Sequence, residues 1–258
     1  MSNPNMDSGS EHKSEISSKQ SNNKISENNS ITEINKRNIE ILPENTNKSD
    51  LSFKIIIIGD SSVGKSSLAN KAIKNKFENV YSATLGFDYF SLFVKIDGKI
   101  LKLQIWDTCG QEIYQSLITN FFRNSSLAIM VYSIDNRSSF EHIDNWLKEI
   151  KINSNPDAKV FLIGNKADLE DKRVVTYEEA EKYAEELDFS KFYETSAKTG
   201  FNAQQIFLEA AYLLYDDYSD YKDSKSHNTS ILSHSFGQKL NYSNESKDSK
   251  KDKSTDCC

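Results

Sequence analysis

The segment from Phe53 to Ile73 constrains the fold of this chain more than any other part of it. Phe53–Ile58 is a run of mostly β-branched residues, typical of a buried parallel strand. Gly59–Ser66 follows with the sequence GDSSVGKS, which fits the pattern G-x-x-x-x-G-K-[ST]. The sequence of Ser66–Ile73 predicts the first turns of a helix. Strand, glycine-containing loop and helix start together predict a phosphate-binding loop within an α/β domain.

In such a loop, backbone N–H groups wrap the phosphates and the helix N-terminus adds partial positive charge. We expect Lys65 to reach the β- and γ-phosphates as one of two catalytic residues, and the Ser66 hydroxyl to bind Mg²⁺. The expected phosphate contacts from this loop are Ser62, Val63, Gly64, Lys65, Ser66 and Ser67. A plain Gly/Ser turn is the alternative, which the preceding strand and the Lys65-Ser66 pair disfavour.

Composition excludes several classes of protein. The formal net charge of −6 over 258 residues gives no sign of binding to a nucleic acid polymer. No apolar run approaches the roughly 18 residues that cross a membrane, and the N-terminus lacks the apolar core of a secretory signal. The three cysteines are Cys109, Cys257 and Cys258, which form no disulfide framework and fit a reducing cytosolic compartment.

The chain divides into three parts by composition. Residues 1–50 are polar and contain no Phe, Tyr or Trp, so they are predicted to be disordered. Ile39–Leu42 is a short apolar patch in this part of the chain. Its four residues do not indicate whether it packs against the rest of the protein. Residues 51–218 are predicted to form one globular domain, and residues 219–258 a disordered tail that ends in Cys257-Cys258.

Within the domain, strand-like runs alternate with helical spacing. Asp88–Ile96 and Ile100–Trp106 alternate apolar and polar residues around Asp97-Gly98, which predicts a β-hairpin. The pattern predicts a single phosphate-loop α/β domain, with a six-stranded, mostly parallel sheet, one antiparallel strand and flanking helices. The remaining expected strands are 53–58, 126–133, 159–164 and 191–195, and the later helices are 140–152, 177–187 and 203–215.

Two further segments indicate Mg²⁺-dependent hydrolysis. Asp107 follows the second hairpin strand, where a carboxylate directed at Mg²⁺ is expected, and Gly110 can offer an N–H to the γ-phosphate. Gln111 is the second expected catalytic residue, since it can orient a water for in-line attack. The Thr84 hydroxyl, after the first helix, can complete the Mg²⁺ shell when a γ-phosphate is present. Alone, the D-x-x-G-Q pattern would be a plain turn.

Asn165–Asp168, with the sequence NKAD, indicates which base is bound. Asp168 can accept hydrogen bonds from the N1–H and N2–H₂ of guanine, whereas adenine would leave the carboxylate unpaired. The Lys166 stem can cover one face of the base, and N–H groups around Ala197 can contact its O6. Phe77 is a candidate to cover the base edge-on, with core packing as the alternative. The expected base contacts are Phe77, Asn165, Lys166, Asp168, Ser196, Ala197 and Lys198.

With these motifs in their order and spacing, residues 52–215 resemble the Ras-like small GTPases, and in particular the Rab branch. The Rab-like features are Leu85–Tyr89, Lys102–Trp106, Gln111–Leu117 and the double-cysteine end. The resemblance implies a switch in vesicle transport, active with GTP and inactive with GDP, that hydrolyses GTP with Mg²⁺. It also implies an exchange factor, an activating protein, effectors or tethers bound through two switch loops, a prenylation escort and a GDP-dissociation inhibitor.

The resemblance further implies geranylgeranyl groups on Cys257 and Cys258. One lipid chain gives marginal membrane binding and two give stable anchoring. We therefore expect the protein at the cytoplasmic face of an intracellular membrane, Golgi or endosomal, cycling with the cytosol.

The chain departs from the family pattern at Cys109, where the family usually has Ala. A tolerated small residue is the favoured interpretation, with slowed hydrolysis as the alternative. No Arg lies in or near the phosphate loop or the Thr84 loop, which predicts slow intrinsic turnover and a cation supplied by an activating protein.

Two other functions remain open. A phosphate-loop ATPase or nucleotide kinase is disfavoured by Asn165–Asp168. A nucleotide-binding scaffold without hydrolysis is disfavoured by Lys65, Thr84 and Gln111, and kept open by Cys109.

Overall fold

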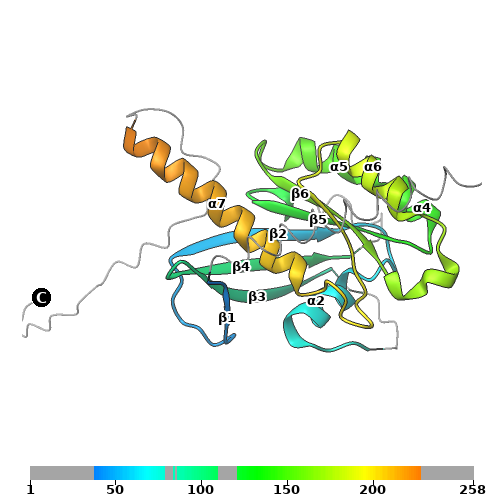
Figure 1. Ribbon diagram of the computed structural model, residues 1–258, viewed down its shortest axis with the longest axis horizontal. Coiled ribbons are helices and arrows are strands. Elements are labelled where there is room, and N and C mark those ends of the chain that lie inside the picture. Colours follow the sequence, from blue (N-terminus) through cyan, green and yellow to red (C-terminus); the bar gives the residue numbers. More distant parts are fainter. Residues whose placement is uncertain (1–37, 79–83, 85, 110–120, 228–258) are drawn as a thin grey trace, which may run out of the picture.

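The computed structural model describes residues 38–78, 84, 86–109 and 121–227 (Figure 1). They form a seven-stranded sheet in the order β1-β3-β4-β2-β5-β6-β7. The strands are β1 (Glu40–Leu42), β2 (Leu51–Ile58), β3 (Phe87–Ile96), β4 (Lys99–Thr108), β5 (Leu127–Ser133), β6 (Lys159–Asn165) and β7 (Lys191–Glu194). The helices are α2 (Lys65–Lys74), α4 (Arg137–Glu141), α5 (Ile143–Asn153), α6 (Tyr177–Glu186) and α7 (Gln205–His227), with the 3₁₀ helix η2 (Ala167–Lys172).

Helices cover both faces of the sheet, and β2 shows why (Figure 1). Successive strand residues point to opposite faces. Ile55 and Ile57 join the core cluster that α2 and α7 cover, while Ile56 and Ile58 join the cluster that α5 and α6 cover. Because β2 is buried on both faces, its sequence is an unbroken apolar run rather than an alternating one.

The predicted sheet pattern is confirmed. β2 pairs in parallel with β4 and β5, and β6 pairs in parallel with β5 and β7. β3 and β4 form the antiparallel hairpin, with Phe87 opposite Thr108. The carboxyl ends of β2, β4, β5 and β6 therefore meet at one edge, where ligands bind in open α/β sheets.

The predicted number of six strands is wrong, because residues 40–42 add a seventh. β1 pairs antiparallel with β3, with Ile41 opposite Val94, and Ile39 packs against the core cluster under α7. The apolar patch in the polar N-terminal part therefore docks, because β3 offers it main-chain partners and a hydrophobic surface. Residues 1–37, predicted to be disordered, lie outside the described residues.

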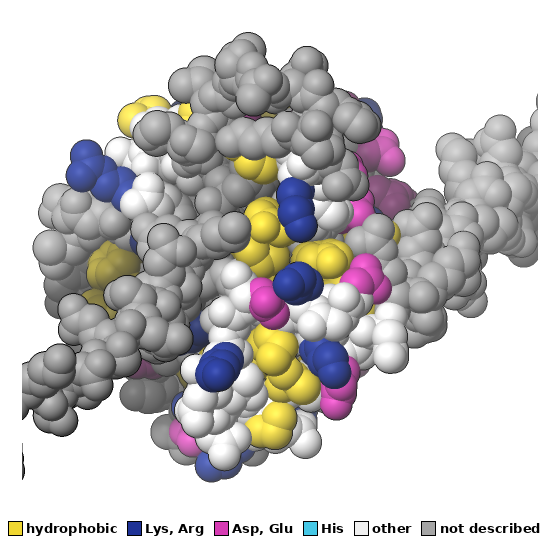
Figure 2. Space-filling model, turned by 90° about the vertical axis from the view of Figure 1, so that its left-hand side faces the viewer, with side chains coloured by type: hydrophobic (Ala, Val, Ile, Leu, Met, Phe, Trp, Pro, Cys, Tyr) yellow, Lys and Arg dark blue, Asp and Glu magenta, His cyan; other side chains and the backbone are white. Residues whose placement is uncertain are grey.

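The chain between β1 and β2 is fastened to the hairpin. Asp50 N donates to Ile100 O at 2.7 Å, and the Asp50 carboxylate accepts from Ile100 N at 2.9 Å. This hydrogen bond, with Lys99 at 3.2 Å, lowers the pKa of Asp50. Figure 2 shows the end of the molecule that lies at the left of Figure 1. Lys and Arg side chains alternate there with Asp and Glu around hydrophobic side chains.

Two helix boundaries also differ from the sequence expectation. The helix expected over 140–152 is divided at His142 into α4 and α5. α7 continues to His227, beyond residue 218 where the domain was expected to end. In the described part of the chain, no helix has the length and apolar character to cross a membrane. Cys257 and Cys258 lie outside the described residues.

Candidate nucleotide-binding site

The phosphate loop runs from β2 into α2 and depends on two glycines. Gly59 has a φ of 135°, and a Cβ there would clash with the carbonyl oxygen of Val131 on β5. Gly64 has a φ of 96°, and a Cβ there would meet the side-chain amide of Asn165. The loop thus lies close against β5 and the end of β6, a path open only to residues without a side chain.

Lys65 begins α2 and is held inside the loop. Its side chain is buried, and its Nζ donates to the carbonyl oxygens of Gly59 at 2.7 Å and Asp60 at 2.6 Å. Burial lowers the pKa of the Lys65 ammonium to about 8, while Asp107 and Asp60 act in the opposite direction. A phosphate beside this ammonium would add the negative charge that favours its protonated form.

The three expected Mg²⁺ ligands come together beside the loop. Ser66 Oγ lies 2.6 Å from Thr84 Oγ1 and donates to Asp107 Oδ2. Asp107 is fully buried, and its Oδ1 has no hydrogen-bond partner in the described part of the chain. Burial raises the pKa of Asp107 to about 6, against the effects of the Ser66 hydrogen bond and of Lys65. An unpaired carboxylate oxygen beside two hydroxyls fits a hard cation such as Mg²⁺.

We expect Mg²⁺ to bind the GDP-loaded protein more tightly as pH rises through about 6. Mg²⁺ favours the ionised form of Asp107, and below its raised pKa the metal competes with the proton. The affinity should therefore fall by about tenfold for each pH unit below that value. Calorimetric titration of Mg²⁺ at a series of pH values measures this. Asp107→Asn should remove this part of the pH dependence, and an identical profile in both proteins would contradict the assignment.

Asn165 links the phosphate loop to the base loops. Its Nδ2 donates to Val63 O at 2.8 Å, and its Oδ1 accepts from Thr195 Oγ1 at 3.1 Å and Ala197 N at 3.3 Å. The residue is fully buried. Sequence reasoning expected Asn165 among the nucleotide contacts, and the structure gives its side chain a role in joining three loops.

Asp168, on η2, is held in place for the base. Its Oδ1 accepts from Ser196 Oγ at 2.6 Å, and its Oδ2 lies 3.7 Å from Lys198 Nζ. Lys166 precedes η2 in the left-handed conformation, with its Nζ 3.5 Å from Asp135 Oδ1. The structure therefore brings together the two segments that sequence reasoning assigned to guanine.

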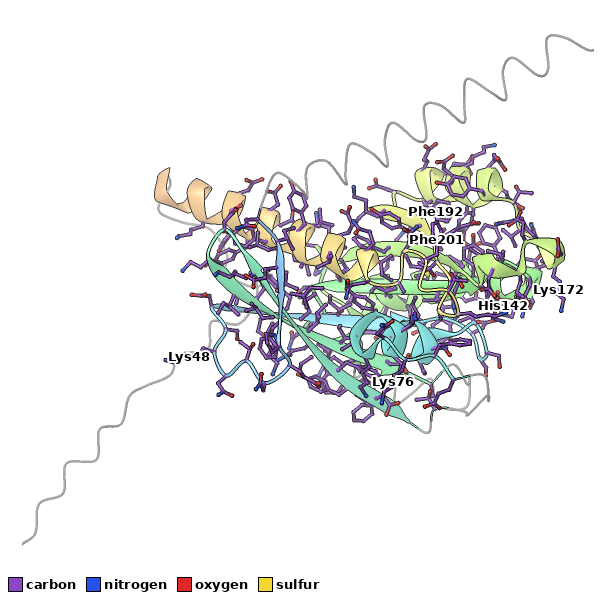
Figure 3. All side chains as sticks on the ribbon, turned by 60° about the horizontal axis from the view of Figure 1, so that its bottom comes forward. Lys48, Lys76, His142, Lys172, Phe192 and Phe201 are labelled. Carbon is purple, nitrogen blue, oxygen red and sulfur yellow. The ribbon has the colours of Figure 1, made fainter. Side chains whose placement is uncertain are left out.

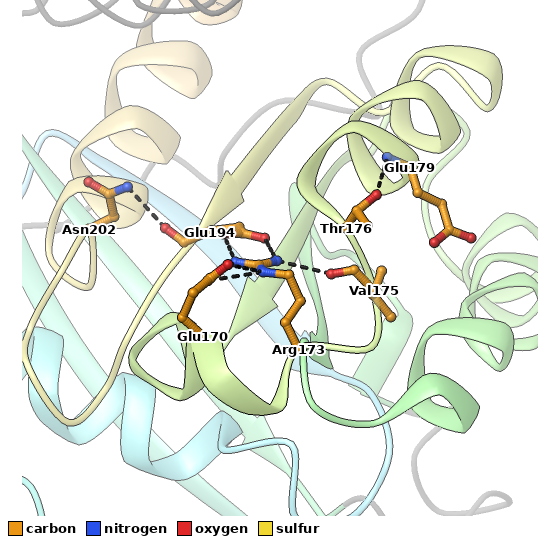
Figure 4. Close-up of polar contacts among 7 residues, drawn as sticks. All are labelled: Glu170, Arg173, Val175, Thr176, Glu179, Glu194 and Asn202. Carbon is orange, nitrogen blue, oxygen red and sulfur yellow. Dashed lines mark hydrogen bonds and ion pairs between the residues drawn. The ribbon is translucent and has the colours of Figure 1, made fainter. Parts of the chain in front are cut away.

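Arg173 fastens these two segments to each other (Figure 4). Its Nη1 and Nη2 donate to the Glu194 carboxylate at 2.6 and 2.8 Å, and Nη1 also donates to Val175 O at 3.0 Å. The Glu170 carboxylate accepts from Nε at 2.9 and 3.0 Å and from Nη2 at 2.7 Å. Hydrogen bonds to Glu194 and Glu170 raise the pKa of Arg173 above its usual range. Sequence reasoning missed the contact with Glu194, because Arg173 and Glu194 are 21 positions apart in the chain and belong to no local pattern.

The remaining expected site residues vary in position. Ser62 is exposed with a φ of 64°, Val63 is buried, and Ser67 is half-buried on α2. Phe77 is half-buried against the core cluster under α7, in agreement with the core-packing alternative. Gly110 and Gln111 lie outside the described residues.

Cys109 is buried with Ile56, Ile58 and Phe122 in the core cluster under α5, and its N donates to Gly86 O at 3.0 Å. This packing supports the interpretation of Cys109 as a tolerated small residue.

The Ras family model matches residues 54–216, more than half of the chain. The matched segment contains the predicted phosphate loop, the three residues expected to bind Mg²⁺ and both segments expected at the base. The chain therefore belongs to the Ras family of small GTPases, which bind GTP and GDP.

Proposed function

We propose that this GTPase is a Rab-like switch in vesicle transport, which binds GTP with Mg²⁺, hydrolyses it slowly and signals through its two switch loops. A partly exposed aromatic cluster carries the proposal: Phe87, Tyr89, Trp106 and Phe121. The Trp106 ring centroid lies 5.3 Å from that of Phe87 and 5.2 Å from that of Tyr89, and the Phe87 and Phe121 centroids are 4.7 Å apart. Phe87 and Tyr89 are 45% and 43% exposed.

Clustered exposed aromatic side chains mark protein interaction sites. β3, which carries Phe87 and Tyr89, begins shortly after Thr84, and β4, which carries Trp106, ends just after Asp107. Both strands thus connect the aromatic cluster to residues expected at the γ-phosphate and Mg²⁺. Loss of the γ-phosphate would release the two loops, an order–disorder change that effectors can distinguish. The cluster therefore supports effectors or tethers as partners.

Hydrolysis in this site is positioning and charge stabilisation. Lys65 would hold the β- and γ-phosphates, Ser66 and Thr84 would hold Mg²⁺, and Gln111 would orient the attacking water. Mg²⁺ would neutralise charge on the phosphates. With no Arg in or near the phosphate loop or the Thr84 loop, an activating protein would supply the remaining cation.

We expect unaided single-turnover hydrolysis on the order of 10⁻⁴ s⁻¹, with acceleration by extract from the source cells. Phosphate release from GTP-loaded protein measures both rates. Gln111→Leu is the matched variant and should lose the acceleration while keeping GTP affinity. Fast hydrolysis without extract, or acceleration that survives Gln111→Leu, would contradict the mechanism.

The membrane part of the proposal depends on Cys257 and Cys258, with geranylgeranyl groups added by a prenylation escort and masked in the cytosol by a GDP-dissociation inhibitor. Mass spectrometry of the C-terminal peptide from the native cells tests for both lipids. A tagged protein with both cysteines replaced by Ser should leave the Golgi or endosomal membrane for the cytosol. An unmodified native C-terminus would refute this part and leave GTP binding unaffected.

A further inference from the structure

The lysine expected to cover the base is held at its ammonium end by Asp135. Lys166 Nζ lies 3.5 Å from Asp135 Oδ1, and the two side chains are 31% and 22% exposed. Lys166 directly follows β6, and Asp135 lies shortly after the end of β5. The two segments meet at the end of the molecule where Figure 3 labels His142, which follows α4, and Lys172, which ends η2. A carboxylate outside the expected base contacts therefore reaches the side chain that would cover the base.

The carboxylate of Asp135 is also fixed by Ser133. Ser133 is fully buried at the end of β5, and its Oγ donates to Asp135 Oδ1. Burial opposes the ionisation of Asp135, but the hydrogen bonds from Ser133 and Lys166 and the charge of Lys166 together lower its pKa. Asp135 is therefore a carboxylate at neutral pH, and one of its oxygens contacts both a hydroxyl and an ammonium.

The main chain beside Asp135 is joined to the main chain beside Lys166. Ile134 N donates to Asn165 O at 3.0 Å, which connects the end of β5 to the end of β6. Ile134 O accepts from Val174 N at 2.9 Å, which connects the same residue to the chain after η2. These bonds fix the positions from which the Asp135 and Lys166 side chains extend.

The main chain of Lys166 is itself constrained. Lys166 has a φ of 66° and a ψ of 35°, in the left-handed region. A residue with a side chain keeps this conformation only where its surroundings impose it, so the start of the lysine stem is fixed. The contact with Asp135 fixes the other end. A free lysine side chain has many rotamers, and fixing both ends of its four-carbon stem removes most of them.

We propose that Asp135 is a positioning residue for the bound base: it holds the stem of Lys166 along the face of the base and so slows the release of nucleotide. A side chain that is already ordered loses less entropy when the ligand binds. Such differences appear mainly in the rate of dissociation. The inference rests on the guanine nucleotide binding proposed above, with Lys166 at the face of the base.

Release of a fluorescent GDP analogue from the full-length protein, at saturating Mg²⁺ and neutral pH, tests the proposal. Asp135→Asn keeps an oxygen for the Ser133 hydroxyl and removes the charge that holds Lys166. It should release nucleotide about fivefold faster than the native protein. Asp171→Asn makes the same change of charge at an exposed position of η2, so it is the control and should release nucleotide at the native rate.

A second substitution separates the ammonium of Lys166 from its stem. Lys166→Met removes the charge and keeps an apolar side chain of similar length. Adding Asp135→Asn to Lys166→Met should leave the release rate unchanged, because Asp135 acts through the ammonium. An acceleration by Asp135→Asn that persists beside Lys166→Met would show a merely structural role and overturn the proposal. A native release rate for Asp135→Asn alone would overturn it as well.

Inosine diphosphate distinguishes the face of the base from its edge, since it lacks the N2 amine that Asp168 is expected to bind. Asp135→Asn should accelerate the release of fluorescent inosine and guanosine diphosphates by the same factor, because both bases present the same face to Lys166. A different factor for the two nucleotides would mean that the substitution displaces Asp168, and would overturn the proposal.

Lys166→Ala separates failure of this inference from failure of the base site. The variant lacks most of the stem and should release GDP faster than the native protein. Fast release from Lys166→Ala beside a native rate for Asp135→Asn would overturn this inference alone. A native rate for Lys166→Ala would overturn the place of Lys166 at the base. Failure of the native protein to bind GDP would overturn the proposed nucleotide binding and this inference together.

Discussion

Asp168→Asn should weaken GTP binding by about 10³-fold and create binding of xanthosine triphosphate. The carboxylate accepts from the N1–H and N2–H₂ of guanine, and an asparagine amide would set its own N–H₂ against the base amine. Xanthine carries a carbonyl at C2, so the same amide can accept from N1–H and donate to that oxygen. Asn would also keep an oxygen for the Ser196 hydroxyl, which lies 2.6 Å from Asp168 Oδ1, so the loop geometry should survive.

Competition of GTP and of xanthosine triphosphate against a fluorescent GDP analogue measures the change of preference from the first nucleotide to the second. Asp171→Asn is the matched control, because Asp171 lies on the same 3₁₀ helix and is exposed. It makes the same change of charge and should leave the preference for GTP intact. An Asp168→Asn protein that still prefers GTP would show that another group recognises the base.

Arg173→Met should lower the free energy of unfolding by about 3–5 kcal/mol, because it leaves the Glu194 carboxylate buried and unpaired. The two side chains are only 15% and 10% exposed, so water cannot replace the lost partner. Guanine nucleotide affinity should fall as well, since Glu194 directly precedes the Thr195–Ala197 loop. Urea unfolding and GDP titration measure the two effects.

Replacing both partners by apolar residues separates pairing from burial. Arg173→Met with Glu194→Met should recover part of the stability, because no buried charge then remains. Arg137→Met is the control for losing a guanidinium, since Arg137 makes the exposed contacts with Glu141 and Glu179 at 3.2 and 2.7 Å. It should cost far less than Arg173→Met. Equal costs for the two arginines would contradict the role assigned to Arg173.

The parts of the site that could be predicted are those encoded by short local patterns. Gly59–Ser66 lies between a buried strand and a helix, and Asp107 and Asn165 lie at strand ends, so the topology brings them to one edge of the sheet. The contacts that could not be predicted join distant segments. Asp60 meets His142 through side chains 82 positions apart, and neither residue stands out in its own neighbourhood.

In the fold too, local sequence patterns predict some elements, while others depend on contacts between distant segments. The parallel strands follow from β-branched runs, because burial on both faces demands them. The strand at residues 40–42 was missed because its three residues lie in a polar segment that was predicted to be disordered. It forms by pairing with the edge of β3, and that edge exists only in the folded sheet. The break at His142 was missed because helical spacing continues through it.

β1 has a consequence for the shortest useful form of the protein. The family match begins at residue 54, yet the sheet begins at Glu40. A chain shortened to Leu51 would keep every nucleotide-binding loop but leave the main-chain groups of Phe93–Lys95 open to strands from neighbouring molecules, the usual start of aggregation. β1 thus covers the Phe93–Lys95 part of the β3 edge, and we expect a chain that retains it to self-associate less than one shortened to Leu51.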